Sequence, residues 1–429
     1  CPTEAILESA KEADQALAKG NHRGFLHGLP MAPKDLTATY GIATTLGSPL
    51  LKNQTQLSDS IMVERLRKNG AILIGKTNVP EFGLGSHTYN PVFGTTLNAY
   101  DQSKSAGGSS GGAAVSLALN MLPVADGSDF GGSLRNPAAW NNVYGLRPSR
   151  GRVPATGPEV FYDHFSTEGP MARNVQDLAM LLSVQAGYDQ RAPLSLTTEG
   201  KVFAQSLQSN MVGKKVAWLG DFHGYLPMEP GLLGALENAL GYFKDLQVEV
   251  EAQKVHYPIE QLWEFWLVLR AFITSGKLAS LYQEESNRAL LKPEAIWEIE
   301  QSQRYSAQEV YRASVLRTSW YKAITQLFEQ YDYLLLPATQ VMPFDAKLHW
   351  PKEIAGRKMD TYHRWMEVVI GPTMAGLPVL AIPAGMHQGL PIGLQLIGKP
   401  QGEMELLQMG YAWEQATPFK DFRPNLLQA

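Results

Sequence analysis

The chain contains a single cysteine, Cys1, among its 429 residues. An internal disulfide is therefore excluded, and so is a metal cluster held by several thiolates. Charged residues make up only 18% of the sequence, against roughly 25% in an average globular domain, and no segment concentrates lysine or arginine. A nucleic-acid-binding surface would need a basic stripe, so we expect no nucleic-acid partner.

Long hydrophobic runs are also missing. No stretch reaches the roughly 18 apolar residues of a membrane span, and the most apolar long region, 262–278, is interrupted by Glu264, Arg270 and Lys277. We expect this region to form a buried helix. Metal-ligand spacings are absent as well, so neither a metal nor another cofactor is expected. The sequence does not begin with methionine, which is compatible with a start further upstream, and a cytoplasmic location is the default expectation.

Glycine and hydrophobic residues, in contrast, are plentiful. Hydrophobic side chains account for 44% of the chain and 39 residues are glycine, a share slightly above the usual value of about 7%. A chain of this length can bury a substantial core. The composition therefore favours a large, compact, loop-rich enzyme over a disordered or fibrous protein.

Hydrophobic patterning predicts alternating helices and strands. Amphipathic segments predict a long helical region at roughly 259–331 and shorter helices at 5–19, 61–68, 231–246 and 403–415. Short apolar segments predict strands at 71–75, 215–219, 247–250, 333–336, 379–382 and 392–397. This alternation predicts an α/β fold in which one large mixed, mostly parallel β-sheet is covered by helices on both faces.

Glycine and serine gather in a first cluster, Ser105–Gly112, directly before a predicted helix at 113–120. Glycine weakens helices and strands, so four glycines around Ser109 and Ser110 indicate a backbone with unusual dihedral angles close to another group. Three interpretations compete. A phosphate loop lacks its Gly-Lys-Ser/Thr ending, a nucleophile elbow of the G-x-S-x-G type lacks the preceding strand and a suitable histidine, and a flexible Gly/Ser turn is common in loops.

A second cluster, Asp126–Arg135, lies further along the chain. The successive backbone N–H groups of Phe130, Gly131, Gly132 and Ser133 could converge on one oxygen, as they do in an oxyanion hole. A serine at the end of such a nest is well placed to attack the carbonyl carbon whose oxygen the nest holds. This cluster favours a serine hydrolase.

Three glycine-containing segments follow one another in the order Gly107–Gly112, Gly131–Ala138 and Gly145–Val153. Together with Lys34 and its neighbours upstream, and with segments at 169–173 and 389–395 downstream, they resemble the amidase signature family over essentially the whole chain. Each segment alone is a weak signal, but in this order and spacing they are highly specific.

The resemblance implies a catalytic triad of two serines and a lysine. In it Ser133 is the nucleophile, Ser109 relays protons and is preceded by a cis peptide bond, and Lys34 is the base. A lysine can act as a base only when it is neutral, which requires its pKa to fall well below the usual value of about 10.4, and burial favours that fall. An acyl-enzyme on Ser133 and its hydrolysis by water follow.

Three further side chains are expected to support the triad. We expect Ser110 to stabilise its loop by hydrogen bonding, and Arg135 to anchor the second cluster through charge-assisted hydrogen bonds. Asp129 either accepts from the amides of the nest or orients the serines, and orientation is favoured. Phe130 stands where the family usually carries a small residue, so we expect it to reshape the mouth of the acyl site.

The resemblance also implies one domain over 1–429, with a signature core at about 28–180, a helix-rich variable segment at about 180–330, and C-terminal strands and a helix at about 331–429. The implied function is that of a free-standing amidase acting on a small linear or cyclic amide. Two alternatives are the glutaminase subunit of a tRNA-dependent amidotransferase, which shares the triad, and a non-catalytic binding protein with the same fold. A homodimer is compatible with the sequence.

Overall fold

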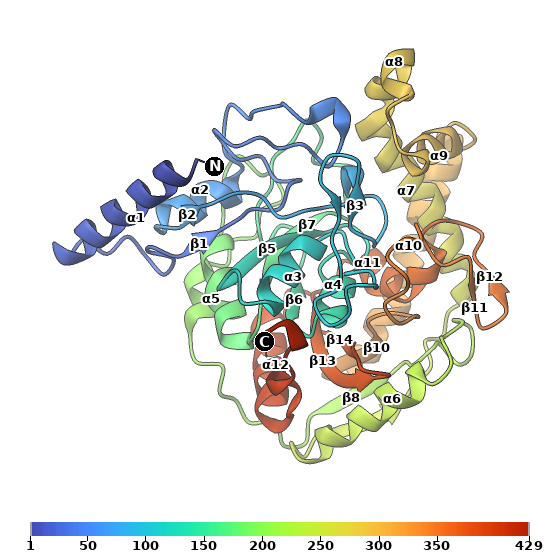
Figure 1. Cartoon of the computed structure of the whole chain (residues 1–429). Helices are drawn as coiled ribbons and strands as arrows, with labels where there is room; N and C mark the ends of the chain where they lie inside the picture. Colours follow the sequence, from blue (N-terminus) through green and yellow to red (C-terminus); the bar gives the residue numbers. More distant parts are fainter. Residues whose placement is uncertain (1, 428–429) are drawn as a thin grey trace.

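An eight-stranded β-sheet forms the centre of the computed structural model, which describes residues 2–427 (Figure 1). Its strands lie in the order β5-β7-β6-β13-β14-β10-β8-β9. Their bounds are β5 Val124–Asp129, β6 Tyr144–Arg147, β7 Thr167–Ala172, β8 Lys215–Trp218, β9 Glu249–Ala252, β10 Tyr333–Pro337, β13 Val379–His387 and β14 Leu390–Ile397. Three two-stranded sheets pair β1 Pro30–Met31 with β2 Ile72–Leu73, β3 Tyr89–Asn90 with β4 Gly94–Thr95, and β11 Glu353–Ile354 with β12 Arg357–Lys358.

Twelve α-helices are present among residues 2–427. They are α1 Thr3–Ala18, α2 Ile61–Lys68, α3 Gly111–Ala118, α4 Arg135–Trp140, α5 Val175–Gln185, α6 Leu232–Ala239, α7 Ile259–Gln283, α8 Glu285–Arg288, α9 Pro293–Ser302, α10 Ala307–Gln326, α11 Ile370–Ala375 and α12 Glu403–Ala416. None of the helices in this range is both long and apolar enough to cross a membrane.

The sheet is mixed, as predicted, but it is mostly antiparallel, and the prediction of a parallel majority is wrong. Five of the seven neighbouring pairs are antiparallel, and only β8 pairs in parallel with β9 and β10. The reason is local at the centre, where Gln388 and Gly389 join β13 to β14 with φ angles of 50° and 80°. Two such residues make a tight hairpin, which forces its strands to run antiparallel.

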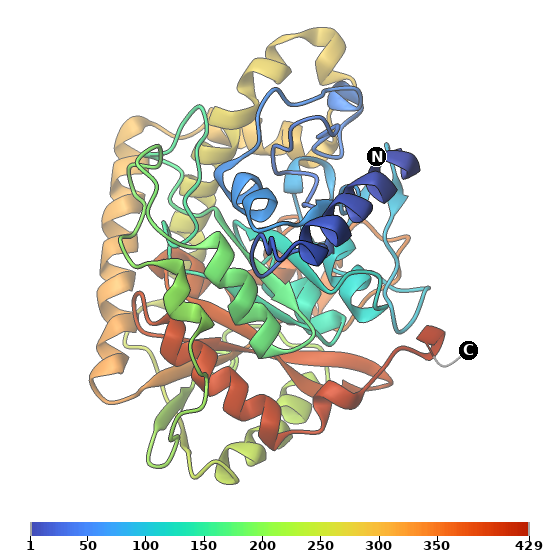
Figure 2. The ribbon, with the colours of Figure 1, turned by 90° about the vertical axis from the view of Figure 1, so that its left-hand side faces the viewer.

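Helices cover both faces of the sheet, as predicted. Successive residues of a strand point to opposite faces; in β10, Leu335 packs into one core and Leu334 and Leu336 into the other. The first core is completed by α5, α6 and α12, and the second by α7, α10 and α11. Figure 2 shows α5 (green) and α12 (red) side by side on the first face, where they contact one another.

Most of the predicted elements are present with small shifts at their ends, and α2 has the predicted bounds. The segment at 71–75 forms only the short β2, which pairs with β1 outside the main sheet. The three strands β5, β6 and β7 were not predicted, yet they form one edge of the sheet. The two glycine-rich clusters of the sequence lie at this edge, because one spans the end of β5 and the turn after it, and the other leads into α3, which packs on β5.

Candidate active site

Lys34 lies at the centre of a buried group of hydroxyl and carbonyl oxygens. A bridge to Thr77 holds its backbone beside the segment that follows β2. Its Nζ is 2.8 Å from Ser109 Oγ, 2.9 Å from Ser110 Oγ, and 3.0 Å from both the carbonyl and the hydroxyl oxygen of Ser128. The residue has no exposed surface. Contacts from separate segments of the chain therefore fix the amine.

Burial lowers the pKa of Lys34 from its usual 10.5 to about 7. The carboxyl groups of Asp129, Asp126 and Glu168 oppose this fall, because negative charge favours the ammonium form, but burial has the larger effect. At neutral pH a large share of Lys34 is therefore an uncharged amine. Such an amine keeps two N–H donors and one lone pair, which can accept a proton from Ser109.

Ser109 and Ser110 lie in the tight turn that begins α3. The peptide bond between Gly108 and Ser109 is cis, as the resemblance implies. The turn is closely packed, since a Cβ atom at Gly112 would lie 2.4 Å from the backbone nitrogen of Asn78. Both serine hydroxyls lie within hydrogen-bonding distance of the lysine amine. Ser110 therefore contacts the candidate base directly, which goes beyond the loop-stabilising role expected of it.

Ser133 lies at the end of the turn that follows β5. Its backbone carbonyl accepts a hydrogen bond from the N–H of Ser110 at 3.2 Å, which ties the two serine-bearing segments together. Its hydroxyl has no hydrogen-bond partner within residues 2–427, and it lines the same chamber as Ser109. The structure thus brings Lys34 and Ser109 into contact and leaves the Ser133 hydroxyl able to turn toward either Ser109 or a substrate.

The predicted oxyanion hole contains fewer available donors than the four N–H groups expected. The N–H of Gly132 donates to Asp129 Oδ1 at 2.8 Å, so it is already occupied. In the described part of the chain, the N–H groups of Phe130, Gly131 and Ser133 have no acceptor, and all three residues line the chamber. The N–H groups of Phe130, Gly131 and Ser133 are therefore the donors available to receive a developing negative oxygen.

Asp129 organises the turn that carries these donors. Its carboxylate accepts hydrogen bonds from the N–H of Gly132 and from the guanidinium groups of Arg135 and Arg147. Although burial opposes it, the two arginine charges hold the pKa of Asp129 well below its usual value. No serine hydroxyl of residues 2–427 contacts this carboxylate, so the favoured orienting role is not met. Arg135 also donates to Gln395 of β14 at 2.6 Å, and it anchors the cluster as predicted.

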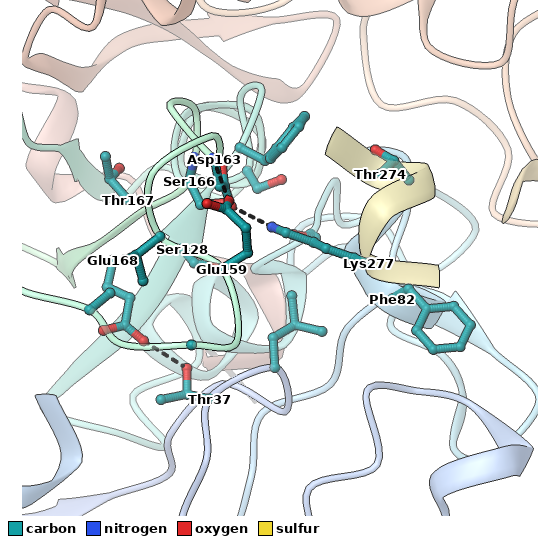
Figure 3. A pocket seen from close by; sticks show the side chains of 18 of the residues that line it. Thr37, Phe82, Ser128, Glu159, Asp163, Ser166, Thr167, Glu168, Thr274 and Lys277 are labelled. Carbon is teal, nitrogen blue, oxygen red and sulfur yellow. Dashed lines mark hydrogen bonds and ion pairs between the residues drawn. The ribbon is translucent and has the colours of Figure 1, made fainter. Parts of the chain in front are cut away.

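A chamber of about 570 Å³ opens onto Ser109 and Ser133. Its wall is largely apolar and includes Leu36, Leu46, Leu51, Phe82, Leu84, Phe130, Val153, Leu278, Leu281 and Met366. The loop between β6 and β7 closes one side, where Asp163 forms an ion pair with Lys277 of α7 (Figure 3). A chamber of this size and character can hold an organic molecule with a sizeable apolar group.

Three polar residues near Lys34 are absent from the prediction made on the sequence: Asp126, Ser128 and Glu168. Asp126 Oδ2 accepts the backbone N–H of Lys34 at 3.0 Å. Burial raises the pKa of Glu168 to about 7, and the charge of Asp126 adds to the rise. All three lie on β5 and β7, whose aspartate, glycine and serine residues disfavour strands on propensity. Asp126 and Ser128 lie within the second cluster, Asp126–Arg135, which could have drawn attention to them, whereas no such signal marks Glu168.

Comparisons with known proteins match the chain to a family of amidases. The sequence model of a family described as Amidase matches residues 1–407. A glutamyl-tRNA(Gln) amidotransferase subunit of Dehalococcoides mccartyi is 32% identical to the chain over 452 aligned positions, which cover 99% of the chain and 90% of that protein.

Solved structures of amidases and of an amidotransferase subunit also match the chain. The backbone superimposes with a TM-score of 0.90 on a bacterial aryl acylamidase of the amidase signature family, which is 30% identical; the match covers 97% of this chain and 89% of the other. The corresponding glutamyl-tRNA(Gln) amidotransferase subunit of Thermotoga maritima is 27% identical, with a TM-score of 0.77 and coverage of 92% and 85%.

Proposed function

This chain belongs to the amidase signature family, and we propose from this that it hydrolyses the C–N bond of a carboxamide through an acyl-enzyme on Ser133. The contact between Lys34 and Ser109 carries the proposal. A buried amine with a pKa of about 7 lies 2.8 Å from the hydroxyl of Ser109, which lines the same chamber as the candidate nucleophile. Perturbed titratable groups that face a chamber are typical of catalytic sites.

The first half of the proposed reaction forms the acyl-enzyme. Neutral Lys34 accepts the proton of Ser109 Oγ, which in turn accepts the proton of Ser133 as its Oγ bonds to the substrate carbonyl carbon. The carbonyl oxygen becomes negative and is stabilised by N–H groups among those of Phe130, Gly131 and Ser133. When the C–N bond breaks, the proton returns from Lys34 through Ser109 to the departing nitrogen.

The second half releases the acid. A water molecule gives a proton through Ser109 to Lys34 and attacks the ester carbon on Ser133. The same N–H groups stabilise the second tetrahedral intermediate. Its collapse returns the proton to Ser133 Oγ and frees the carboxylic acid, so each residue ends in its starting state.

Loss of the nucleophile tests this proposal directly. We expect Ser133→Ala to lower turnover of any amide substrate by several orders of magnitude, as loss of a triad member does in other serine hydrolases. The melting temperature should change little, because the substitution removes one atom that lacks a hydrogen bond. A fluorophosphonate probe should label the wild-type protein and not the variant. An unlabelled, folded wild-type protein would instead favour the non-catalytic binding protein.

The first candidate for the finer function is a glutaminase subunit that supplies ammonia to a partner. The curated relatives support it, since glutamyl-tRNA(Gln) amidotransferase subunits from Dehalococcoides mccartyi and Moorella thermoacetica match 99% of the chain at 31–33% identity. These names favour it over an amidase that acts alone.

An independent amidase is the second candidate, and two observations favour it. The chamber wall is largely apolar, while glutamine carries two charged groups near its α-carbon. The backbone also superimposes better on the aryl acylamidase than on the Thermotoga maritima amidotransferase subunit, with TM-scores of 0.90 and 0.77.

The two candidates are separated by substrate preference. Ammonia release from glutamine and aniline release from an acylated aniline are measured with the same purified chain, with Ser133→Ala as the blank. A larger kcat/KM for glutamine selects the glutaminase subunit, and a larger kcat/KM for the anilide selects the independent amidase.

A further inference from the structure

Seven side chains that line the chamber can carry charge, and five of them already have strong partners. Asp163 pairs with Lys277, and Glu159 accepts three backbone N–H groups. On the cationic side, Arg270 pairs with Glu298, and Arg150 donates to His164 and to the carbonyl of Val160. Lys277 is the cation of the ion pair with Asp163. These groups hold the walls together and have little capacity left for a ligand.

His363 and Glu168 are the two members of this set without a strong partner. Neither ring nitrogen of His363 has a hydrogen bond among residues 2–427. Burial lowers the pKa of its imidazole well below the usual value, and neighbouring arginines lower it further, so the ring is uncharged near neutral pH. Aromatic rings of Trp263 and Trp266 flank it. Glu168 is therefore the acidic residue of the chamber lining whose hydrogen-bonding capacity is largely unused.

Glu168 lies close to the catalytic group through the sheet. It is paired in register with Ser128 across β5 and β7, and Ser128 contacts Lys34 Nζ. One carboxyl oxygen of Glu168 receives a single long hydrogen bond, 3.4 Å from Thr37 Oγ1, and the other has no partner in the described chain. Figure 3 shows Glu168 beside Thr37, below and to the left of the Asp163–Lys277 pair in this view.

We propose that Glu168 binds an ammonium group of the substrate, so that the enzyme prefers amides whose acyl chain carries a primary amine. This inference rests on the proposed amide hydrolysis. Burial raises the pKa of Glu168 to about 7, so part of this carboxyl group is protonated at neutral pH. A bound ammonium favours its carboxylate form, and a charge-assisted hydrogen bond between the two is among the strongest available. The apolar wall then holds the chain that links the amine to the scissile amide.

The charges around Glu168 agree with this assignment. Asp126 faces it from β5, Lys34 from the segment after β1, and Lys76 from the segment after β2. The side-chain amines of Lys34 and Lys76 donate hydrogen bonds to hydroxyl and carbonyl oxygens, and neither forms an ion pair with Glu168. A bound ammonium would also disfavour a positive charge on nearby Lys34. The substrate would thereby help to keep its own base neutral.

The test compares matched amides in which one end is an ammonium or a methyl group. Primary amides of ω-amino acids, with acyl chains of roughly three to six carbons, are paired with alkyl amides of equal length, and glutamine is assayed beside them. We expect wild-type kcat/KM to be higher for the ammonium member of at least one pair, by about tenfold or more. Glu168→Gln should abolish this ratio. Glu159→Gln, a chamber carboxylate whose oxygens are occupied, should preserve it.

The ratio of kcat/KM for the ammonium member to kcat/KM for the alkyl member distinguishes substrate binding by Glu168 from an effect of Glu168 on Lys34. A change in the pKa of Lys34 that Glu168→Gln causes in the free enzyme acts on both members of a pair, so equal losses in Glu168→Gln would overturn substrate binding and assign Glu168 to tuning the base. A wild-type ratio near one in every pair would also overturn it. The rate of fluorophosphonate labelling reports on Ser133 independently. Absence of both labelling and amide turnover would therefore count against amide hydrolysis itself.

Discussion

Lys34 combines two properties that usually exclude one another, a fixed position and an uncharged amine at neutral pH. Its four oxygen contacts would suit an ammonium group, yet burial outweighs them and lowers the pKa to about 7. Asp126, Asp129 and Glu168 limit the fall. The balance leaves the pKa close to neutral pH, where a general base is most effective.

The pH dependence of the reaction follows from this balance. Lys34 must be neutral to accept a proton, so kcat/KM should rise with pH and reach half of its plateau near pH 7. Asp126→Asn removes a negative charge that favours the ammonium form, and it should move this midpoint to lower pH. The measurement is kcat/KM of an uncharged amide between about pH 5 and pH 9. A midpoint that stays in place in Asp126→Asn would contradict the electrostatic account.

Asp129 is the residue on which the oxyanion turn depends structurally. Asp129→Asn removes the only negative charge that Arg135 and Arg147 contact within the described chain. Breaking a buried ion pair on one side typically costs about 3–5 kcal/mol. We expect a loss of unfolding free energy of that size in urea, together with a large fall in kcat. Asp14→Asn on the exposed face of α1 is the matched control and should change neither quantity.

At the scale of elements, the loop between β6 and β7 forms a chamber wall that is held in place by side chains. Lys277 of α7 contacts Asp163, and this positive charge holds the pKa of Asp163 at about 2 against the opposing effect of burial. Glu159 accepts the N–H groups of residues 161–163. The loop therefore keeps its shape mainly through one ion pair and one acidic cap.

Lys277→Met should loosen this loop without unfolding the protein. Partly exposed ion pairs contribute only about 0–1 kcal/mol to stability, so the melting temperature should change little. We expect faster proteolysis within 155–166 and a rise in KM that exceeds any fall in kcat, since the loop lines the chamber and does not contact the triad. Lys201→Met removes a surface pair with Glu199 and should leave both readouts as in the wild type. Unchanged proteolysis in Lys277→Met would show that the pair does not hold the loop.

The elements also show which parts of the structure the sequence could predict. Apolar segments such as β13 and β14 were found because burial on both faces leaves a continuous hydrophobic run. The edge strand β5 was missed because its sequence, Val-Ala-Asp-Gly-Ser-Asp, is dominated by residues that disfavour strands. Its polar side chains face the interior because Asp126 and Ser128 contact Lys34, and Asp129 contacts Arg135 and Arg147. These contacts between distant segments leave no periodic pattern in the sequence.

The candidate site also contains residues that the sequence could predict and residues that it could not. Family resemblance identified Lys34, Ser109 and Ser133 as the triad, and the structure places the first two in hydrogen-bonding contact. Ser128 and Glu168 were missed, since each reaches the site through the pairing of β5 with β7. The antiparallel majority of the sheet was also out of reach, because the connections between most strands are long and do not fix direction.

At the scale of the whole molecule, one sheet joins segments from distant parts of the chain. The C-terminal strands β13 and β14 lie between β6 and β10, so strands that are far apart in the sequence are neighbours in the sheet. Both helical layers rest on the same strands. Leu335 and Leu336 are neighbours on β10, but they pack into opposite cores.

This arrangement predicts that the chain unfolds as one cooperative unit. Leu335→Ala and Leu336→Ala each remove a fully buried side chain, and each should lower the free energy of unfolding by about 2–5 kcal/mol. If the two cores are coupled through the sheet, both variants shift the same single transition, and circular dichroism and tryptophan fluorescence report one midpoint. Independent cores would instead give two transitions, of which each variant would move only one. The chamber around the nucleophile needs both the sheet and a helical layer, since Ser133 follows β5 and Lys277 belongs to α7. Loss of fluorophosphonate labelling should therefore coincide with that single transition.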